Sequence, residues 1–190
     1  MIRFYELLLP ALWFIWIFYW FAAARNVKRT QRYESRLSRL SHTLPFAAGI
    51  FLFCASHRLG GPLFGLIVPR SELLYWLGVI LTLTGFYITV KARIVLGRNW
   101  SGTVTLKENH ELIQTGPYRY VRHPIYTGLI LAFFGSAVAL DEWRGVLAVL
   151  LIIIAFRIKL GIEERWMTDY FGPMYASYRR RTKMIVPFIW

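Results

Sequence analysis

Residues 73–90 read LLYWLGVILTLTGFYITV, a stretch of 18 positions without a charged side chain. A helix of about 18 residues rises roughly 27 Å, which nearly crosses the hydrocarbon core of a bilayer. Residues 7–24, LLLPALWFIWIFYWFAAA, form a second uncharged stretch of the same length. A cleavable signal peptide is the competing interpretation of this second stretch. Its tryptophans, the Arg3 and Glu6 ahead of it and the basic loop behind it favour a membrane span instead.

Three shorter apolar runs complete the pattern, at 43–56, 125–140 and 145–158. The last is long enough only if Arg157 and Lys159 extend their charged ends to the membrane surface. The whole chain is 56% hydrophobic and 17% charged, whereas soluble domains average about 25% charged residues. We therefore expect an all-α, polytopic integral membrane protein with about five transmembrane helices, forming a single membrane domain over 1–190.

The distribution of basic residues supports five spans. Segments 25–42, 91–124 and 157–190 carry 19 of the 23 Lys and Arg residues. Five spans place these three segments on one side of the membrane, which the positive-inside rule makes cytoplasmic. The N-terminus is then expected outside and the C-terminus in the cytoplasm. The net charge of +13 follows from this topology, so nucleic acid is not an expected partner, whereas membrane lipids are.

Several kinds of site are absent from the sequence. Cys54 is the one cysteine, and no Cys/His spacing typical of zinc is present, so no metal is expected. The sequence contains no GxGxxG, P-loop, HExxH or GxSxG motif. A nucleotide-binding fold of the soluble type is therefore not indicated.

Polar and aromatic residues are concentrated between His110 and Gly128. Pro124 suits the first turn of the fourth helix, where its missing N–H costs nothing. His123 is then expected at the N-cap, with Tyr126 on nearly the same face. A helix N-terminus at the membrane surface favours an anionic group. The alternative is that His123 and Tyr126 only cap and anchor the helix.

A second polar cluster follows the fifth apolar run. Lys159 and Glu163 are four residues apart, so on a continuing helix they would share a face, as Arg157 and Glu164 would at a spacing of seven. Adjacent carboxylates beside a membrane pocket could bind a cationic or hydroxyl-bearing ligand, and surface ion pairing is the alternative. Beyond them, the break at Gly172-Pro173 predicts two short interfacial helices in the C-terminal tail.

These residues carry a resemblance to a known family. The pattern Gly116-x-Tyr118-x3-Arg122-His123-Pro124-x-Tyr126-x-Gly128, preceded by His110-x-Leu112-Ile113, resembles the isoprenylcysteine carboxyl methyltransferases. Later segments match the same family in the same order: Glu163-Glu164, Phe171-Gly172-x2-Tyr175-x2-Tyr178 and Pro187-Phe188-Ile189. The resemblance covers residues 95–190. It implies a membrane methyltransferase that binds S-adenosyl-L-methionine on the cytoplasmic side.

The resemblance also implies roles for individual residues. The implied catalytic residues are Lys159, Glu163 and Arg122. The basic side chains among them would neutralise an anionic group. Lys159 stands where the eukaryotic enzymes have an arginine facing the substrate carboxylate, and lysine lacks the bidentate fork of arginine. The cofactor would contact His110, Glu111, Leu112, Ile113, Tyr118, His123, Pro124, Ile125, Tyr126 and Glu163.

The expected function is therefore methyl transfer from S-adenosylmethionine to a lipophilic or prenylated acceptor from the bilayer: a carboxylate, a lipid amine or a thiol. Residues 1–94 supply the N-terminal spans, and residues 95–190 supply the cofactor-binding and catalytic half. The resemblance to compact prokaryotic relatives implies the inner membrane of a bacterial or archaeal cell. The alternatives are an NADPH-dependent membrane reductase of the sterol-reductase type and a non-enzymatic membrane protein.

Overall fold

The computed structural model describes residues 2–25, 27–56 and 59–186, with side chains from residue 7 onward. The match to the family pattern at 187–189 lies outside the described residues. Within them, four helices are long and apolar enough to cross a membrane: α1 (Ile2–Ala24), α2 (Arg36–Cys54), α3 (Glu72–Leu96) and α5 (Trp143–Phe171). The prediction of a polytopic membrane protein is confirmed.

The remaining apolar helix, α4 (Pro124–Leu140), has 17 residues and is shorter than the other four. It ends where Asp141 takes a left-handed conformation, with φ of 53°. Five apolar helices therefore stand where five spans were expected, and a full crossing by α4 stays a prediction.

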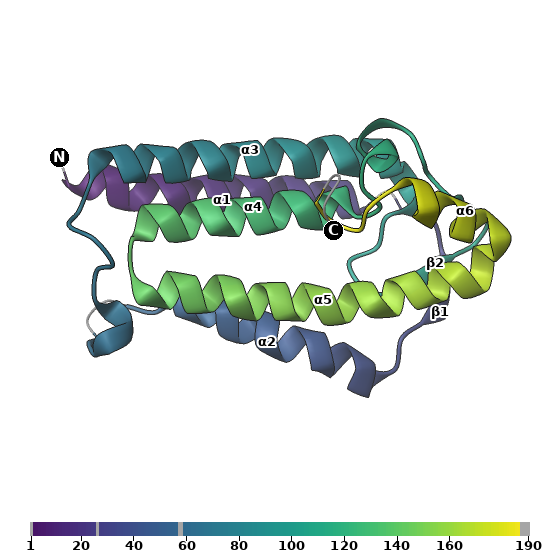
Figure 1. Cartoon of the computed structure of the whole chain (residues 1–190), viewed down its shortest axis with the longest axis horizontal. Helices are drawn as coiled ribbons and strands as arrows, with labels where there is room; N and C mark the ends of the chain where they lie inside the picture. The colour runs from purple at the N-terminus through teal and green to yellow at the C-terminus, as the bar shows by residue number, and fades with distance from the viewer. Residues whose placement is uncertain (1, 26, 57–58, 187–190) are drawn as a thin grey trace.

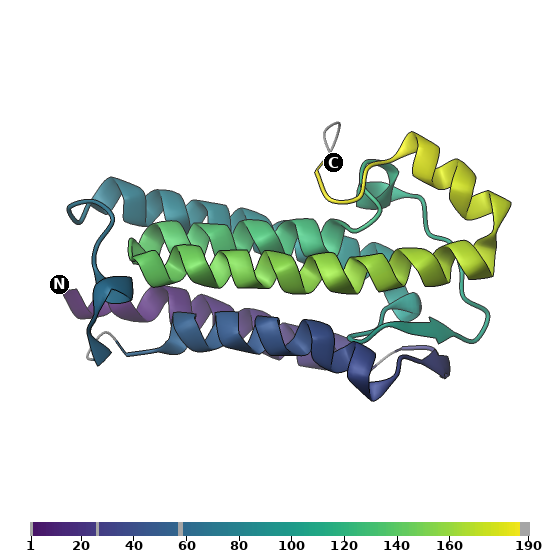
Figure 2. The same ribbon diagram turned by 60° about the horizontal axis from the view of Figure 1, so that its bottom comes forward.

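The five helices lie side by side in an elongated bundle (Figures 1 and 2). The α3 and α4 helices pack together along their length, α5 packs on α4, and α2 packs along α5. The short helix α6 (Pro173–Arg181) and the two strands lie together at one end of the bundle, whereas the N-terminus lies at the other (Figure 1). The three basic segments of the sequence therefore meet at a single end.

A small antiparallel sheet joins two of these basic segments, and the sequence pattern did not indicate it. Strand β1 (Thr30–Tyr33) pairs with β2 (Thr105–Lys107), with Thr30 opposite Lys107 and Tyr33 opposite Thr105. One strand precedes α2 and the other follows α3. The sheet therefore links the N-terminal and C-terminal halves outside the bundle.

Glycines bring the backbones of α3 and α4 into direct contact. A Cβ atom placed on Gly85 would lie 2.4 Å from the carbonyl oxygen of Gly128, and one on Gly78 would lie 2.5 Å from that of Gly135. Real Cβ atoms do not approach oxygen so closely, so the contact requires glycine at these positions. Small residues at helix interfaces in membranes permit this close packing.

The α1 helix contacts the bundle through its tryptophans instead. The indole of Trp13 donates a hydrogen bond to the Ser136 hydroxyl at 2.9 Å, and that of Trp16 donates to the Thr89 hydroxyl at 2.8 Å. Trp13 also stacks on Phe133, with ring centroids 4.5 Å apart. The tryptophans that favoured a retained span over a signal peptide thus form half-buried contacts between helices.

The tail differs from the expectation of two short helices. Residues 163–171 are the last turns of α5, which runs without interruption through the predicted end of the fifth span at 158. Gly161 does not break the helix, because a single glycine inside a helix costs only about 1 kcal/mol. The predicted break is at Gly172, where φ is 51° and α6 begins.

Candidate functional site

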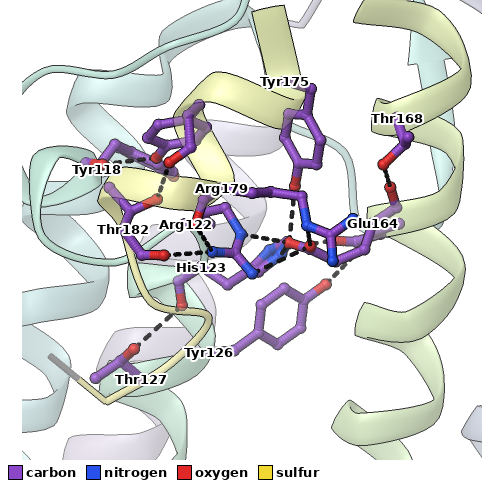
Figure 3. A network of polar contacts seen from close by, with 12 residues as sticks. Tyr118, Arg122, His123, Tyr126, Thr127, Glu164, Thr168, Tyr175, Arg179 and Thr182 are labelled. Carbon is purple, nitrogen blue, oxygen red and sulfur yellow. Dashed lines mark hydrogen bonds and ion pairs between the residues drawn. The ribbon is translucent and has the colours of Figure 1, made fainter. Parts of the chain in front are cut away.

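The start of α4 follows the sequence prediction. His123 is the N-cap residue and Pro124 occupies the first turn. The C-terminal segment returns across this helix start, where the backbone N–H groups of Arg122 and His123 donate to the carbonyls of Lys183 and Met184. The Thr127 hydroxyl donates to the carbonyl of Ile185 at 2.7 Å (Figure 3). The helix start is thus fixed by residues far away in sequence.

One buried carboxylate, that of Glu164, joins α4, α5 and α6 (Figure 3). The Arg122 guanidinium donates to both of its oxygens, at 2.8 and 3.1 Å. The Tyr175 hydroxyl donates at 2.7 Å and Nε2 of His123 lies 2.9 Å away. Arg179 adds an ion pair at 3.3 Å. Such bidentate and charge-assisted bonds are the strong ones, so Glu164 organises this end of the bundle.

The neighbouring carboxylate, Glu163, is arranged differently. The Tyr126 hydroxyl donates to its Oε1 at 2.7 Å, and Nδ1 of His123 lies 3.6 Å from its Oε2. The side chain keeps 19% of its surface exposed, so it retains room to accept another hydrogen bond. The two polar clusters of the sequence therefore meet in space, with His123 between the two glutamates.

His110 and Glu111 belong to a second group on the loop that follows β2. The His110 ring packs against Phe171 and Tyr170, with ring centroids 5.7 and 6.3 Å away. Burial, helped by the charges of Lys28 and Lys107, lowers the pKa of His110 from 6.5 to about 4. The exposed Glu111 pairs with Lys28 at 3.1 Å, and this hydrogen bond lowers its pKa.

The apolar members of the predicted cofactor site pack between these two groups. Tyr118 and Ile125 are buried together with Ala92, and Ile113 packs against them. Leu112 is half-buried and Pro124 is fully buried. The Tyr178 hydroxyl donates to the carbonyl of Tyr118 at 2.6 Å, and burial raises the pKa of both phenols well above the ordinary value. Both tyrosines therefore stay protonated at neutral pH.

A cavity of about 1860 Å³ extends along the bundle beside this site. Aromatic and aliphatic side chains of α1 and α2 form much of its wall, among them Trp13, Trp20, Phe46 and Phe53. One end of the cavity reaches Tyr126, Lys159 and the loop 100–103. An apolar cavity with a few convergent polar groups is the usual form of a small-molecule site.

The predicted catalytic residues have different surroundings. Lys159 lines the cavity, donates to the carbonyl of Gly102 at 2.6 Å and lies 5.5 Å from the Tyr126 ring centroid. Glu163 lies beside Tyr126 through its hydrogen bond. Arg122 is 8% exposed, and besides Glu164 it donates to the carbonyl of Thr182 at 2.6 Å. Because its donors are used inside the protein, Arg122 holds Glu164 rather than facing a ligand.

The sequence predictions omitted several residues at the end of the bundle that carries the candidate site. Tyr175 was part of the family pattern but was given no role, and Glu164 was considered only together with Glu163 as a possible ligand-binding pair, although Glu164 and Tyr175 form the central buried cluster. Glu34 and His42 form a buried pair on the other side of the cavity, and no motif marks them. In the ranges that the structure describes, no cluster of three His, Cys, Asp or Glu residues could hold a metal.

Comparison with known proteins places this geometry in a family. A family model described as "Phospholipid methyltransferase" matches residues 73–174, which include α3, α4, α5 and both glutamates. The fold resembles the structure of the eukaryotic intramembrane Ras methyltransferase ICMT, with a TM-score of 0.61 and 22% identity. The superposition covers 78% of this chain and 52% of that one.

Curated relatives include methyltransferases of two kinds. The chain is 31% identical over 108 residues to the protein-S-isoprenylcysteine O-methyltransferase of Schizosaccharomyces pombe, covering 55% of this chain and 46% of that protein. It is 26% identical to an enzyme of the same name, form B, from Arabidopsis thaliana, covering 64% of each. It is also 37% identical over 70 residues to methanethiol S-methyltransferase 1 of Bradyrhizobium diazoefficiens, covering 37% of this chain and 24% of that protein.

The chain thus spans between about half and two thirds of the length of the first two relatives. Their names favour a methyltransferase over the reductase alternative, and the resemblance predicted from the sequence motifs is confirmed. Because the family model matches more than half of the chain, this protein belongs to the phospholipid methyltransferase family.

Proposed function

We propose that this protein is an S-adenosylmethionine-dependent methyltransferase whose acceptor enters from the bilayer. The observation that supports this most is the meeting of Tyr126, His123 and Glu163 next to the end of an apolar cavity that Tyr126 and Lys159 line. Family membership supports the reaction type. In this proposal residues 95–190 bind the cofactor, and the basic end of the bundle faces the cytoplasm of a bacterial or archaeal cell.

The donor set around α4 suits the cofactor. Glu163, as a partly exposed carboxylate, can accept hydrogen bonds from an ammonium or from ribose hydroxyls. The Tyr126 ring lies beside it and can contact a sulfonium through its π face, an interaction of about 1–2 kcal/mol. Ile113 and Ile125 offer an apolar surface for a base. His110 is kept neutral by its lowered pKa and accepts the Lys107 backbone N–H through Nδ1, so its Nε2–H can donate one hydrogen bond.

When bound, the cofactor supplies an electrophilic methyl group, and the residues of this chain have to position the acceptor against it. The cavity holds the apolar part of the acceptor. Lys159, at the end of the cavity that it lines together with Tyr126, can hold an anionic head group. Correct placement of two reactants can supply about 7–11 kcal/mol of the barrier reduction. Exclusion of water by the tryptophans of α1 and the phenylalanines of α2 strengthens each polar contact inside the cavity.

Calorimetry of S-adenosylmethionine binding in detergent tests the cofactor. We expect the wild-type protein to bind, and Glu163→Gln and Tyr126→Phe to bind about tenfold to a hundredfold more weakly, because each loses a hydrogen bond to a charged group. The exposed Glu108 provides a matched control, and Glu108→Gln should bind like the wild type. A folded wild-type protein without affinity for the cofactor would refute the function. Equal binding by all variants would refute only the site.

The acceptor class is tested separately, by transfer of a labelled methyl group to a total lipid and small-molecule extract of the source cell. We expect the label in a lipophilic product. Label found only in water-soluble products would contradict entry from the bilayer.

A further inference from the structure

A histidine outside the family match lines the same cavity as Lys159 and Tyr126. His42 belongs to α2 and is 5% exposed. Of the other α2 residues that line the cavity, Phe46, Ile50 and Phe53 are apolar, whereas Thr43 carries a hydroxyl and Cys54 a thiol. A buried ionisable side chain on such a mostly apolar wall requires a specific partner, because burial of a polar group without one is costly.

The partner of His42 is Glu34, whose side chain is 1% exposed. Nε2 of His42 lies 3.2 and 3.1 Å from the two carboxylate oxygens. The Ser38 hydroxyl and the Val104 backbone N–H donate to the same carboxylate at 3.1 and 3.3 Å. Arg39 lies 4.0 Å away. An ionised carboxylate only accepts hydrogen bonds, so the proton of a neutral His42 ring is on Nε2.

This arrangement determines the role available to the other ring nitrogen. In the part of the chain that the structure describes, all hydrogen bonds of the His42 ring are made through Nε2. Nδ1 of the neutral ring carries a lone pair, and the ring borders the cavity. A carboxylate that fixes one ring nitrogen and leaves the other as a proton acceptor is the arrangement of a general base.

The same loop connects His42 to the proposed reaction site. Val104 contacts Glu34, and two residues earlier the carbonyl of Gly102 accepts a hydrogen bond from Lys159 at 2.6 Å. One turn along α2 from His42, Phe46 packs against Phe156, with ring centroids 5.7 Å apart. Phe156 is one turn before Lys159 on α5. His42 and Lys159 therefore lie at the same end of the cavity, on facing helices.

We propose that His42 is the general base for a lipophilic thiol acceptor, and that Glu34 is its positioning residue; this inference rests on the proposed function. Nδ1 of His42 takes the proton of the thiol. The sulfur then forms a bond to the methyl carbon as the bond from that carbon to the sulfonium breaks, and the electron pair of that bond stays on the donor sulfur. The products are a methyl thioether, the demethylated donor and a protonated His42.

The surroundings favour a thiol over the other acceptor classes. A carboxylate is already deprotonated at neutral pH and needs no base. An alkylammonium would be repelled by the Lys159 ammonium, whereas a developing thiolate would be stabilised by it. Lysine also lacks the planar fork that binds a carboxylate bidentately.

Kinetics with two probes of equal chain length test the inference: dodecanethiol and dodecanoate, with labelled S-adenosylmethionine in micelles. General bases contribute about 10²–10⁴-fold. His42→Gln should therefore lower kcat for dodecanethiol by about that factor, and Glu34→Gln by a smaller factor. Ser41→Ala, on the same helix, is the control and should match the wild type. Added imidazole should restore methylation of dodecanethiol by His42→Ala.

A readout independent of turnover is the ¹⁵N spectrum of His42. We expect the neutral Nε2–H tautomer, with the Nδ1 resonance shifting when dodecanethiol is added. Failure of imidazole to rescue, a wild-type protein that methylates only dodecanoate or neither probe, or an unshifted Nδ1 resonance would each overturn the proposal. None of these outcomes affects cofactor binding as measured by calorimetry. A protein that binds S-adenosylmethionine but fails these tests would therefore refute this inference and leave the proposed function standing.

Discussion

A buried pair of an arginine and a glutamate lies at each end of α5, Arg144 with Glu142 and Arg122 with Glu164, and the two pairs have different roles. At the N-terminal end, Arg144 pairs with Glu142 and donates to the backbone carbonyls of Leu52, Phe53 and Ala55. These carbonyls belong to the last turn of α2, which lacks partners within its own helix. Arg144 therefore acts as a helix cap supplied by another helix.

At the C-terminal end, the partners of Glu164 are mainly side chains from α4 and α6. One residue before it, Glu163 reaches Tyr126 and keeps part of its surface exposed. The comparison shows that a buried ion pair is not by itself a sign of function. The end that we propose as functional is the one where a second carboxylate lies beside Tyr126, which lines the cavity together with Lys159.

The largest expected effect is at Glu164. Glu164→Gln removes the charge that Arg122 and Arg179 share, and removal of one partner of a buried pair costs about 3–5 kcal/mol. Chemical denaturation in detergent should show a loss of this size in the free energy of unfolding. Glu163→Gln is the matched control and should lose stability by less than half as much. Equal losses would mean that the two glutamates do not differ in role.

The second prediction concerns the other end. Arg144→Met keeps the length of the side chain but leaves the last carbonyls of α2 without a donor, which we expect to cost about 2–3 kcal/mol. The affinity of the folded fraction for S-adenosylmethionine should equal that of the wild type. Calorimetry on the folded protein, separated from unfolded material, measures this affinity. A reduced affinity would show that the two ends of α5 are coupled.

The smallest expected effect is a pH dependence of the free energy of unfolding, which arises at the C-terminal end of α5 and not at its N-terminal end. The folded pKa of His110 is about 4 and its unfolded value is 6.5. The unfolded state therefore takes up this proton first, so the contribution of His110 to stability is constant above pH 6.5 and declines as the pH falls towards 4. His110→Gln should remove this decline, and Arg144→Met should retain it. A histidine NMR resonance for His110 that titrates near 6.5 would contradict the prediction.

Helix content and its membrane character were predictable because they depend on composition and on local pattern. The runs at 7–24 and 73–90 fall within α1 and α3, and Pro124 begins α4 as the proline position indicates. The continuity of α5 through Glu163 was not predicted, since the charged residues after 158 suggested an end that the helix does not have. The β1–β2 sheet was also missed, because its strands are short and 71 residues lie between them in the sequence.

Within the candidate site, the family pattern indicated which residues meet, but spacing alone did not show how. Both Glu163 and Glu164 follow the same apolar run, and only the packing of α6 decides that Glu164 is enclosed while Glu163 is not. Arg122 directly precedes His123 in sequence, yet its donors are used by Glu164 and Thr182. The pairing of Glu34 with His42 depends on the loop before α2, where no periodicity constrains the chain.

The glycine contact between α3 and α4 also determines which parts of the bundle can move. A shift of either helix by one residue along its neighbour would bring a side chain to a place where only hydrogen fits. We therefore expect these two helices to move together as one rigid unit. The α1 helix contains no glycine and contacts the bundle through indole hydrogen bonds and ring stacking instead. We therefore expect an opening of the cavity towards the lipid to occur on the α1 side.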